Sequence, residues 1–137
     1  MAKSIKSINI INIRYLGIEG HAEYCNLSKK LVFGHDCNAL NRIVTVQSIS
    51  GTGALRVAFE FLRRYVPGTI HVPKPTWITH HAIIKDAGLN FKEYPYYNPK
   101  NKDFNFSAMV DYLLALPQRS VVLLHAAAHN PTGKNIF

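Results

Sequence analysis

Three short stretches of this sequence carry side chains that could bind a ligand. The first is Ser50-Gly51-Thr52-Gly53, where small hydroxyl residues alternate with glycines ahead of an apolar-periodic stretch. Glycine lets the backbone approach a ligand closely, and the N–H groups of a first helical turn attract anions. The pattern is not a P-loop, because no Gly-Lys-Ser/Thr follows, and Arg56 stands where a dinucleotide fingerprint has its third glycine. These residues predict either a phosphate cradle or an ordinary capped turn.

The other two stretches supply a ring and an amide. Trp77, the single tryptophan, closes the segment PKPTW, and an indole there could stack on a flat heteroaromatic ring or simply pack between a helix and a sheet. Asn130 precedes Pro131, which holds it extended, and its amide can both donate and accept a hydrogen bond. A turn-forming Asn-Pro pair is the alternative for Asn130.

The elements that must position these residues alternate along the chain. After a first amphipathic helix, strands and helices follow each other in turn, with polar turns at 98–103 and 130–133. This order predicts an α/β fold of three layers, α/β/α, with a mainly parallel sheet and ligands at the carboxyl ends of its strands. The predicted helices are 19–33, 53–65, 77–88 and 106–116, and the predicted strands are 43–47, 69–72, 89–96 and 120–129.

Composition excludes several classes of function. The chain has 137 residues and 47% hydrophobic content, which suits one domain, and it has no apolar run long enough to span a membrane. Its net charge of +8 is scattered over separate segments, so we expect no nucleic-acid partner. The spacing of Cys25 and Cys37 fits no zinc site, and the seven histidines form no metal-binding motif, so we expect no metal.

Taken together, the motifs resemble one family. SGTGALR, PKPTW with a histidine three residues after the tryptophan, and VVLLHAAAHNPTG resemble the class I aspartate aminotransferases, which are pyridoxal-phosphate enzymes of fold type I. HNPTG alone marks the broader class I aminotransferases. The resemblance runs from about Tyr15 to Gly133, whereas residues 1–14 do not match and form an atypical N-terminal segment.

The resemblance implies a role for eight residues. Ser50, Gly51 and Thr52 would hold the 5′-phosphate of pyridoxal phosphate, and Trp77 would stack on its pyridine ring. Asn130 would bind the ring's phenolic oxygen and lie near the substrate carboxylate, so that Trp77 and Asn130 also contact substrate. The remaining roles fall to His80, which would support an aspartate at the pyridinium nitrogen, His125, in the polar network around the ring, and Tyr15, which would reach the phosphate in a neighbouring subunit.

The resemblance also implies that residues 1–137 are part of a large, cofactor-binding domain. The family's Schiff-base lysine lies well beyond HNPTG, so we identify no catalytic residue in this chain and expect it to be inactive alone; Lys134 is interpreted as a solvated lysine. The family forms homodimers that act on small amino acids and 2-oxo acids. It occurs in mitochondria and cytoplasm, and the wording of PKPTW resembles the mitochondrial enzymes somewhat more.

Two other functions stay open at the level of sequence. A non-enzymatic module that binds phosphate or a nucleotide would explain SGTG and the basic charge without any pyridine ring. An aminotransferase for aromatic amino acids would share all the motifs, because the residues that choose between dicarboxylic and aromatic substrates lie largely outside this segment.

Overall fold

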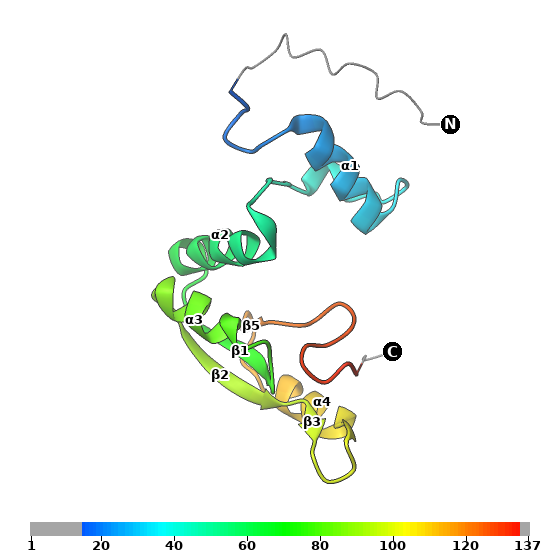
Figure 1. The fold of residues 1–137 in the computed structure, drawn as a ribbon, viewed down its shortest axis with the longest axis vertical. Coiled ribbons are helices and arrows are strands. Elements are labelled where there is room, and N and C mark those ends of the chain that lie inside the picture. The colour runs from blue at the N-terminus through cyan, green and yellow to red at the C-terminus, as the bar shows by residue number, and fades with distance from the viewer. Residues whose placement is uncertain (1–14, 135–137) are drawn as a thin grey trace, which may run out of the picture. The chain divides into compact units, whose positions relative to one another are not determined.

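A computed structural model describes residues 15–134 of the chain (Figure 1). The chain divides into two compact units, Met1–Ser48 and Ile49–Phe137. Each unit has its own secondary-structure elements. No helix among the described residues is long and apolar enough to cross a lipid bilayer.

The first unit contains α1 (Ala22–Phe33) and a short 3₁₀ helix, η1 (Leu40–Arg42). The ring of His21 caps α1 by accepting a hydrogen bond from the backbone N–H of Tyr24 at 3.3 Å. The helix ends at Gly34, whose φ of 86° is accessible to glycine at little cost. The helix predicted over 19–33 is therefore confirmed, with a later start.

The strand predicted over 43–47 is wrong. These residues have no regular secondary structure and belong to no sheet in the described part of the chain. Gln47 instead donates its backbone N–H to the carbonyl of Glu19 at 2.8 Å, and its side chain accepts from the backbone N–H of His21 at 3.0 Å. A β-branched run becomes a strand only beside another strand, and none of the described residues supplies one here.

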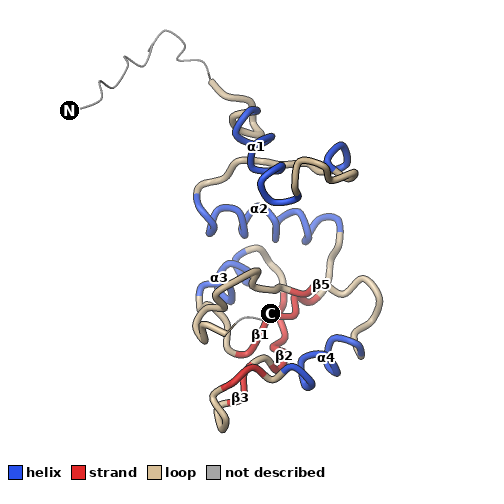
Figure 2. The backbone as a smooth tube through the Cα atoms, turned by 90° about the vertical axis from the view of Figure 1, so that its right-hand side faces the viewer, coloured by secondary structure: helices blue, strands red, loops and turns tan. Residues whose placement is uncertain are grey.

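The second unit is built on a parallel sheet of three strands in the order β2-β1-β5 (Figure 2). These are β1 (Thr69–Lys74), β2 (Asn90–Pro95) and β5 (Val121–Val122). Thr69 of β1 is in register with Asn90, and Ile70 with Val121. The central position of β1 aligns the carboxyl ends of all three strands at one edge, as the sequence predicted.

Helices cover both faces of this sheet (Figure 2). On one face, α2 (Ser50–Tyr65) and α3 (Thr79–Asp86) pack on Ile70 and Val72 in one apolar cluster. On the other face, α4 (Phe106–Leu114) packs through Met109 against Tyr94 and Tyr96 of a second cluster. Alternate residues of a strand point to opposite faces, which explains the two clusters. The three-layer α/β/α prediction is confirmed.

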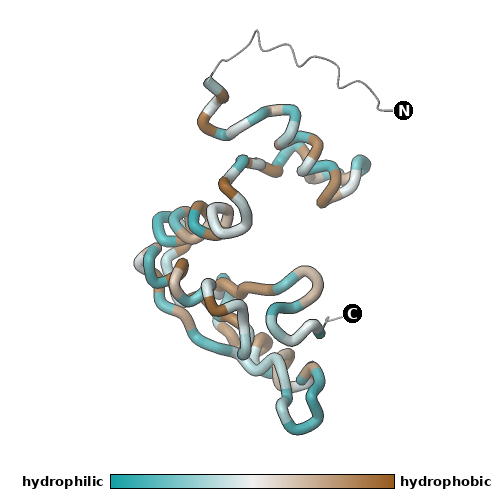
Figure 3. The backbone as a smooth tube through the Cα atoms, in the orientation of Figure 1, coloured by the Kyte–Doolittle hydropathy of each residue, from teal (hydrophilic) through white to brown (hydrophobic). Residues whose placement is uncertain are grey.

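A small hairpin follows β2. It consists of β3 (Tyr97–Asn98) and β4 (Asp103–Phe104), paired antiparallel, with a hydrophilic loop between them (Figure 3). The sequence predicted the polar turn over 98–103 but not the short strands that flank it.

The strand predicted over 120–129 is much shorter than expected. Only Val121 and Val122 form β5; one more hydrogen bond, from the N–H of Leu123 to the carbonyl of His71 at 2.8 Å, continues the pairing. In the described residues β5 pairs with β1 alone. Without a second neighbour the apolar run is not buried on both faces, and Leu124 is 55% exposed. The chain therefore leaves the sheet before His125.

Candidate functional site

The residues predicted to form an anion cradle lie in the first turn of α2. The helix begins at Ser50, three residues earlier than predicted, so Ser50, Gly51 and Thr52 lie inside its first turn and do not follow a strand. Ile49 offers no side-chain cap, and the first backbone bond of the turn runs from Gly53 N–H to Ile49 at 3.0 Å. A Cβ placed on Gly51 would meet no atom within 4 Å. The turn is therefore open and carries partial positive charge.

Ser50 adopts an unusual backbone conformation at this turn. Its φ is 56°, in the left-handed region that a residue with a Cβ seldom occupies. Such strain persists where the surrounding structure demands it, and it is common at ligand sites.

A cavity of about 360 Å³ brings four of the predicted residues together at the carboxyl edge of the sheet. Its polar and aromatic lining consists of Trp77, which follows β1, His80 on α3, and His125 and Asn130 in the segment after β5. Asn130 lies well past Val122, the last residue of β5, not directly behind a strand as predicted. The remaining lining is apolar or backbone: Leu55, Leu123, Leu124, Ala126 and Ala127.

Leu55 connects the cavity to the first turn of α2. It lines the cavity, and it follows Gly51 by four residues and Thr52 by three. Residues at these separations share one face of a helix. The first turn of α2 therefore lies on the same helix face as Leu55, although its own residues do not line the cavity.

A chain of hydrogen bonds links three residues of the cavity lining, Asn130, His125 and His80, through Thr76. The backbone N–H of Asn130 donates to Nδ1 of His125 at 3.2 Å, so the proton of a neutral His125 ring sits on Nε2. That nitrogen lies 3.2 Å from Oγ1 of Thr76, to which it donates. The hydroxyl of Thr76 is then free to donate to Nδ1 of His80 at 2.8 Å. Nε2–H therefore remains the donor of His80.

The electrostatics keep these rings neutral. Burial, and to a lesser extent the nearby His125 and His81 rings, lower the pKa of His80 to about 4. Burial also lowers the pKa of His125. Both rings are uncharged at pH 7, as the hydrogen-bond directions require.

Trp77 presents its indole to the same cavity. The ring is half-buried, rests against the α2–α3 apolar cluster, and meets His80 edge to face at a centroid distance of 5.2 Å and an angle of 86°. It is therefore held in place while part of it stays accessible for stacking on a flat ligand.

Four residues around the cavity had no role in the sequence-based prediction. Thr76 is 8% exposed and connects His80 to His125. His129, 2% exposed, stacks on His125 at 4.2 Å and on Tyr96 at 3.8 Å. Tyr94 and Tyr96 approach from β2 and its end. The separation of four residues between Thr76 and His80, in a segment predicted to begin a helix, was a signal that could have revealed the first of these contacts.

Two other residues had a sequence-based interpretation. Tyr15 is exposed and belongs to the first unit, whereas the cavity lies in the second. The side chain of Lys134 is 44% exposed and its ammonium pairs with the carboxylate of Asp103 at 3.0 Å, so this lysine is solvated, as predicted, and is also an ion-pair partner.

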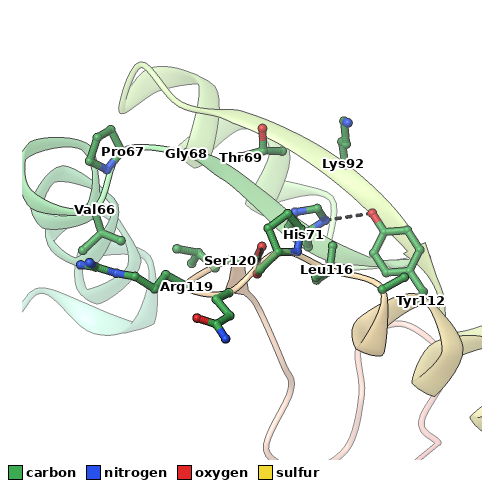
Figure 4. A pocket seen from close by; sticks show the side chains of 14 residues that line it. Val66, Pro67, Gly68, Thr69, His71, Lys92, Tyr112, Leu116, Arg119 and Ser120 are labelled. Atoms are coloured by element: carbon green, nitrogen blue, oxygen red, sulfur yellow. Dashed lines mark hydrogen bonds between the residues drawn. The ribbon is translucent and has the colours of Figure 1, made fainter.

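A larger cavity, of about 490 Å³, lies at the opposite, amino edge of the sheet (Figure 4). It contains none of the predicted site residues, and its most buried polar group, His71, bonds through Nδ1 to the hydroxyl of Tyr112 at 2.9 Å. Ligands of parallel α/β sheets bind at the carboxyl edge, so the smaller cavity is the better candidate. Among residues 15–134, no group of His, Cys, Asp or Glu is arranged to hold a metal ion.

Comparison with known proteins points to one family. The family model for aminotransferase class I and II matches residues 5–136. The mitochondrial aspartate aminotransferase of Dictyostelium discoideum is 47% identical over 136 residues, which are 96% of this chain and 32% of that protein. The chain thus spans about a third of the length of the relatives it matches.

Solved structures agree. The aspartate aminotransferase from Saccharomyces cerevisiae cytoplasm matches with a TM-score of 0.88 at 35% identity, covering 93% of this chain and 32% of that one. An aromatic-amino-acid aminotransferase from Burkholderia pseudomallei, covalently bound to pyridoxal phosphate, matches with a TM-score of 0.87 at 35% identity, covering 93% and 33%.

Proposed function

The chain belongs to the class I and II aminotransferases, and we propose that it forms the cofactor-binding part of an aspartate aminotransferase. The reaction would move an amino group from L-aspartate to 2-oxoglutarate and give oxaloacetate and L-glutamate. Because the chain spans about a third of its relatives, this activity is proposed for a longer protein that contains it. The observation that carries the proposal is the meeting of Trp77, His80, His125 and Asn130 in one cavity beside the first turn of α2.

The residues present fit the phosphate of pyridoxal phosphate. The first turn of α2 has backbone N–H groups ahead of the first intrahelical bond, and the hydroxyls of Ser50 and Thr52 add donors. The open space over Gly51 lets a phosphate oxygen approach the backbone. A dianion would also interact favourably with the helix dipole.

The cavity fits the ring. Trp77 would stack on its face, and the Asn130 side chain would bind its phenolic oxygen and lie near the substrate carboxylate. His80 would offer Nε2–H to a carboxylate at the ring nitrogen, while Thr76 and His125 hold that tautomer. When bound, pyridoxal phosphate supplies an electron sink for the substrate's Cα. No lysine or carboxylate lines the cavity among the described residues, so those groups would come from the rest of the longer protein.

Tyr15 would act in an assembly of two such proteins. It is fully exposed in the first unit and would reach the phosphate in a partner subunit of a homodimer. We propose the mitochondrion or the cytoplasm as the compartment, because the relatives named above come from both.

A chimera tests the proposal. Residues 15–134 replace the aligned segment of the Dictyostelium mitochondrial enzyme, which supplies the remaining two thirds of the protein. We expect transamination of aspartate with 2-oxoglutarate, reduced at least about tenfold by Asn130→Ala or Trp77→Ala, as for loss of a group that positions the reacting atoms. A folded chimera that binds pyridoxal phosphate but transaminates neither aspartate nor phenylalanine would contradict it.

Transfer from aromatic amino acids is the second candidate, favoured by the match to the Burkholderia pseudomallei structure. The same chimera separates the two through the ratio of kcat/KM for aspartate to that for phenylalanine. Much of the substrate contact in the chimera would come from the Dictyostelium part of the protein. The ratio is therefore compared with that of the unaltered Dictyostelium enzyme and with that of a second chimera, in which residues 15–134 replace the aligned segment of an aromatic-specific enzyme. If the ratio in each chimera equals that of the enzyme that supplies the other two thirds of the protein, then residues outside 15–134 determine the substrate specificity.

A further inference from the structure

Two buried tyrosines reach from β2 and its end to the segment that carries His125 and Asn130. Tyr94 and Tyr96 are each 1% exposed, and their separation by two places both on the α4 face of the sheet. The Tyr94 hydroxyl donates to the carbonyl of Leu123, and the Tyr96 hydroxyl to the carbonyl of Lys134, both at 2.9 Å. Burial raises the pKa of both hydroxyls, so they remain protonated donors.

The segment 123–134 needs such anchors. β5 ends at Val122, and the bond from Leu123 N–H to His71 is the last ladder-type contact with β1. Beyond it the backbone is irregular up to Lys134. The two tyrosine hydroxyls bind the first and last residues of this segment, and His125 and Asn130 lie between them.

Side-chain contacts extend the anchor at Tyr96. Its ring stacks on His129 at 3.8 Å and 15°, and His129 stacks in turn on His125. The His129 ring also bonds through Nδ1 to the Thr132 hydroxyl at 2.9 Å. Tyr96 thus contacts His129 directly, and through His129 it supports His125 and Thr132, which lie on either side of Asn130 in the sequence.

We infer that Tyr94 and Tyr96 are positioning residues that bracket segment 123–134 and hold His125 and Asn130 at the cavity. They touch neither ligand nor reacting atoms in this proposal. The effect on the segment depends on the structure alone, whereas the effect on a bound ring rests on the proposed function. Two separate measurements on the 137-residue chain therefore test these two effects.

Amide hydrogen exchange, measured without any ligand, tests whether the two tyrosines hold segment 123–134 in place. Tyr94→Phe and Tyr96→Phe each remove one hydroxyl and keep the ring. We expect the Asn130 amide to exchange about two- to tenfold faster in each, the range for one net hydrogen bond, and faster still in the double variant. Tyr112→Phe is the matched control, because its hydroxyl also makes a 2.9 Å bond, to His71 at the other edge of the sheet. Exchange at Asn130 that changes no more than in Tyr112→Phe overturns the inference.

Ligand affinity tests the consequence for the site. Pyridoxamine 5′-phosphate is the probe, since it cannot condense with surface lysines, and its analogue without the ring hydroxyl is the comparison. We expect Tyr96→Phe to weaken the probe about two- to tenfold and the analogue less, because Asn130 would contact that hydroxyl. Equal weakening of both ligands contradicts a role in positioning Asn130. If the unaltered chain binds neither ligand, the proposed cofactor site fails. The exchange rates then still test whether the two tyrosines hold segment 123–134 in place.

Discussion

The hydroxyl oxygen of Thr76 lies 2.8 Å from Nδ1 of His80, and both side chains are buried. This contact, with the 3.2 Å contact from Thr76 to Nε2 of His125, makes one hydroxyl the link between the two rings and the donor that sets the tautomer of His80. It joins the loop after β1 to the segment after β5, and both histidines line the cavity.

Replacing Thr76 by valine removes this link at nearly constant volume. We expect the free energy of unfolding to fall by about 1–3 kcal/mol, because Nδ1 of the buried His80 loses its donor. Urea titration gives the value, and ¹⁵N shifts of the imidazoles report the tautomer. Thr79→Val, on the half-buried start of α3, is the control. An unchanged His80 spectrum would show that the hydroxyl does not set the tautomer.

Gly51→Ala separates folding from phosphate binding. A Cβ at Gly51 meets nothing within 4 Å, and alanine favours a helix by up to about 1 kcal/mol, so we expect equal or higher stability. The same methyl group would occupy the space of a phosphate oxygen, so affinity for pyridoxamine 5′-phosphate should fall about tenfold or more.

Gly68→Ala is the control for this substitution. A Cβ at Gly68 also meets nothing within 4 Å, and this glycine lines the other cavity. A Gly51→Ala chain that binds the probe as tightly as Gly68→Ala would place the phosphate elsewhere.

Stability should fall in mild acid. Burial lowers the pKa of both His80 and His129 to about 4 from the ordinary value of 6.5. Between those pH values the unfolded chain binds more protons than the folded chain, so the free energy of unfolding decreases as pH falls through this window. Thermal unfolding from pH 7.5 to 4.5 measures it.

The substitution His129→Asn isolates the contribution of His129 to this pH dependence of stability, because the Asn oxygen can replace Nδ1 as the partner of the Thr132 hydroxyl. The variant should show a shallower decrease in stability with falling pH. The exposed His35→Asn is the control. An equal slope in the His129 variant and the unaltered chain would mean that His129 titrates normally when folded.

Borohydride trapping tests the absence of a lysine at the cavity. Among residues 15–134, no lysine lines it, and Lys134 pairs with Asp103. After incubation of the 137-residue chain with pyridoxal phosphate and reduction, peptide mapping should find label spread over several exposed lysines. A single lysine labelled stoichiometrically would contradict this description.

The elements that local signals determine were predictable. The helices start and stop within a few residues of prediction, because their apolar period and the stops at Gly34, Pro67 and Gly88 act locally. The strands over 43–47 and 120–129 were overpredicted, since a ladder depends on a neighbouring strand that residue order does not reveal.

The same distinction holds at the site. Trp77 and Asn130 stood out because their motifs are contiguous in sequence. Tyr96 and His129 did not, because their stacking joins positions 33 residues apart across the fold. Packing partners of this kind follow from topology and not from spacing.

The central claim is that the first turn of α2, Trp77 and Asn130 form one site for a phosphorylated pyridine. Titration of the ¹⁵N-labelled chain with pyridoxamine 5′-phosphate tests it most directly. The account predicts that the Gly51 and Thr52 amides, the Trp77 indole N–H and the Asn130 side-chain amide shift together on one saturation curve. Shifts confined to the cavity around His71 and Lys92, or separate curves for these groups, would contradict it.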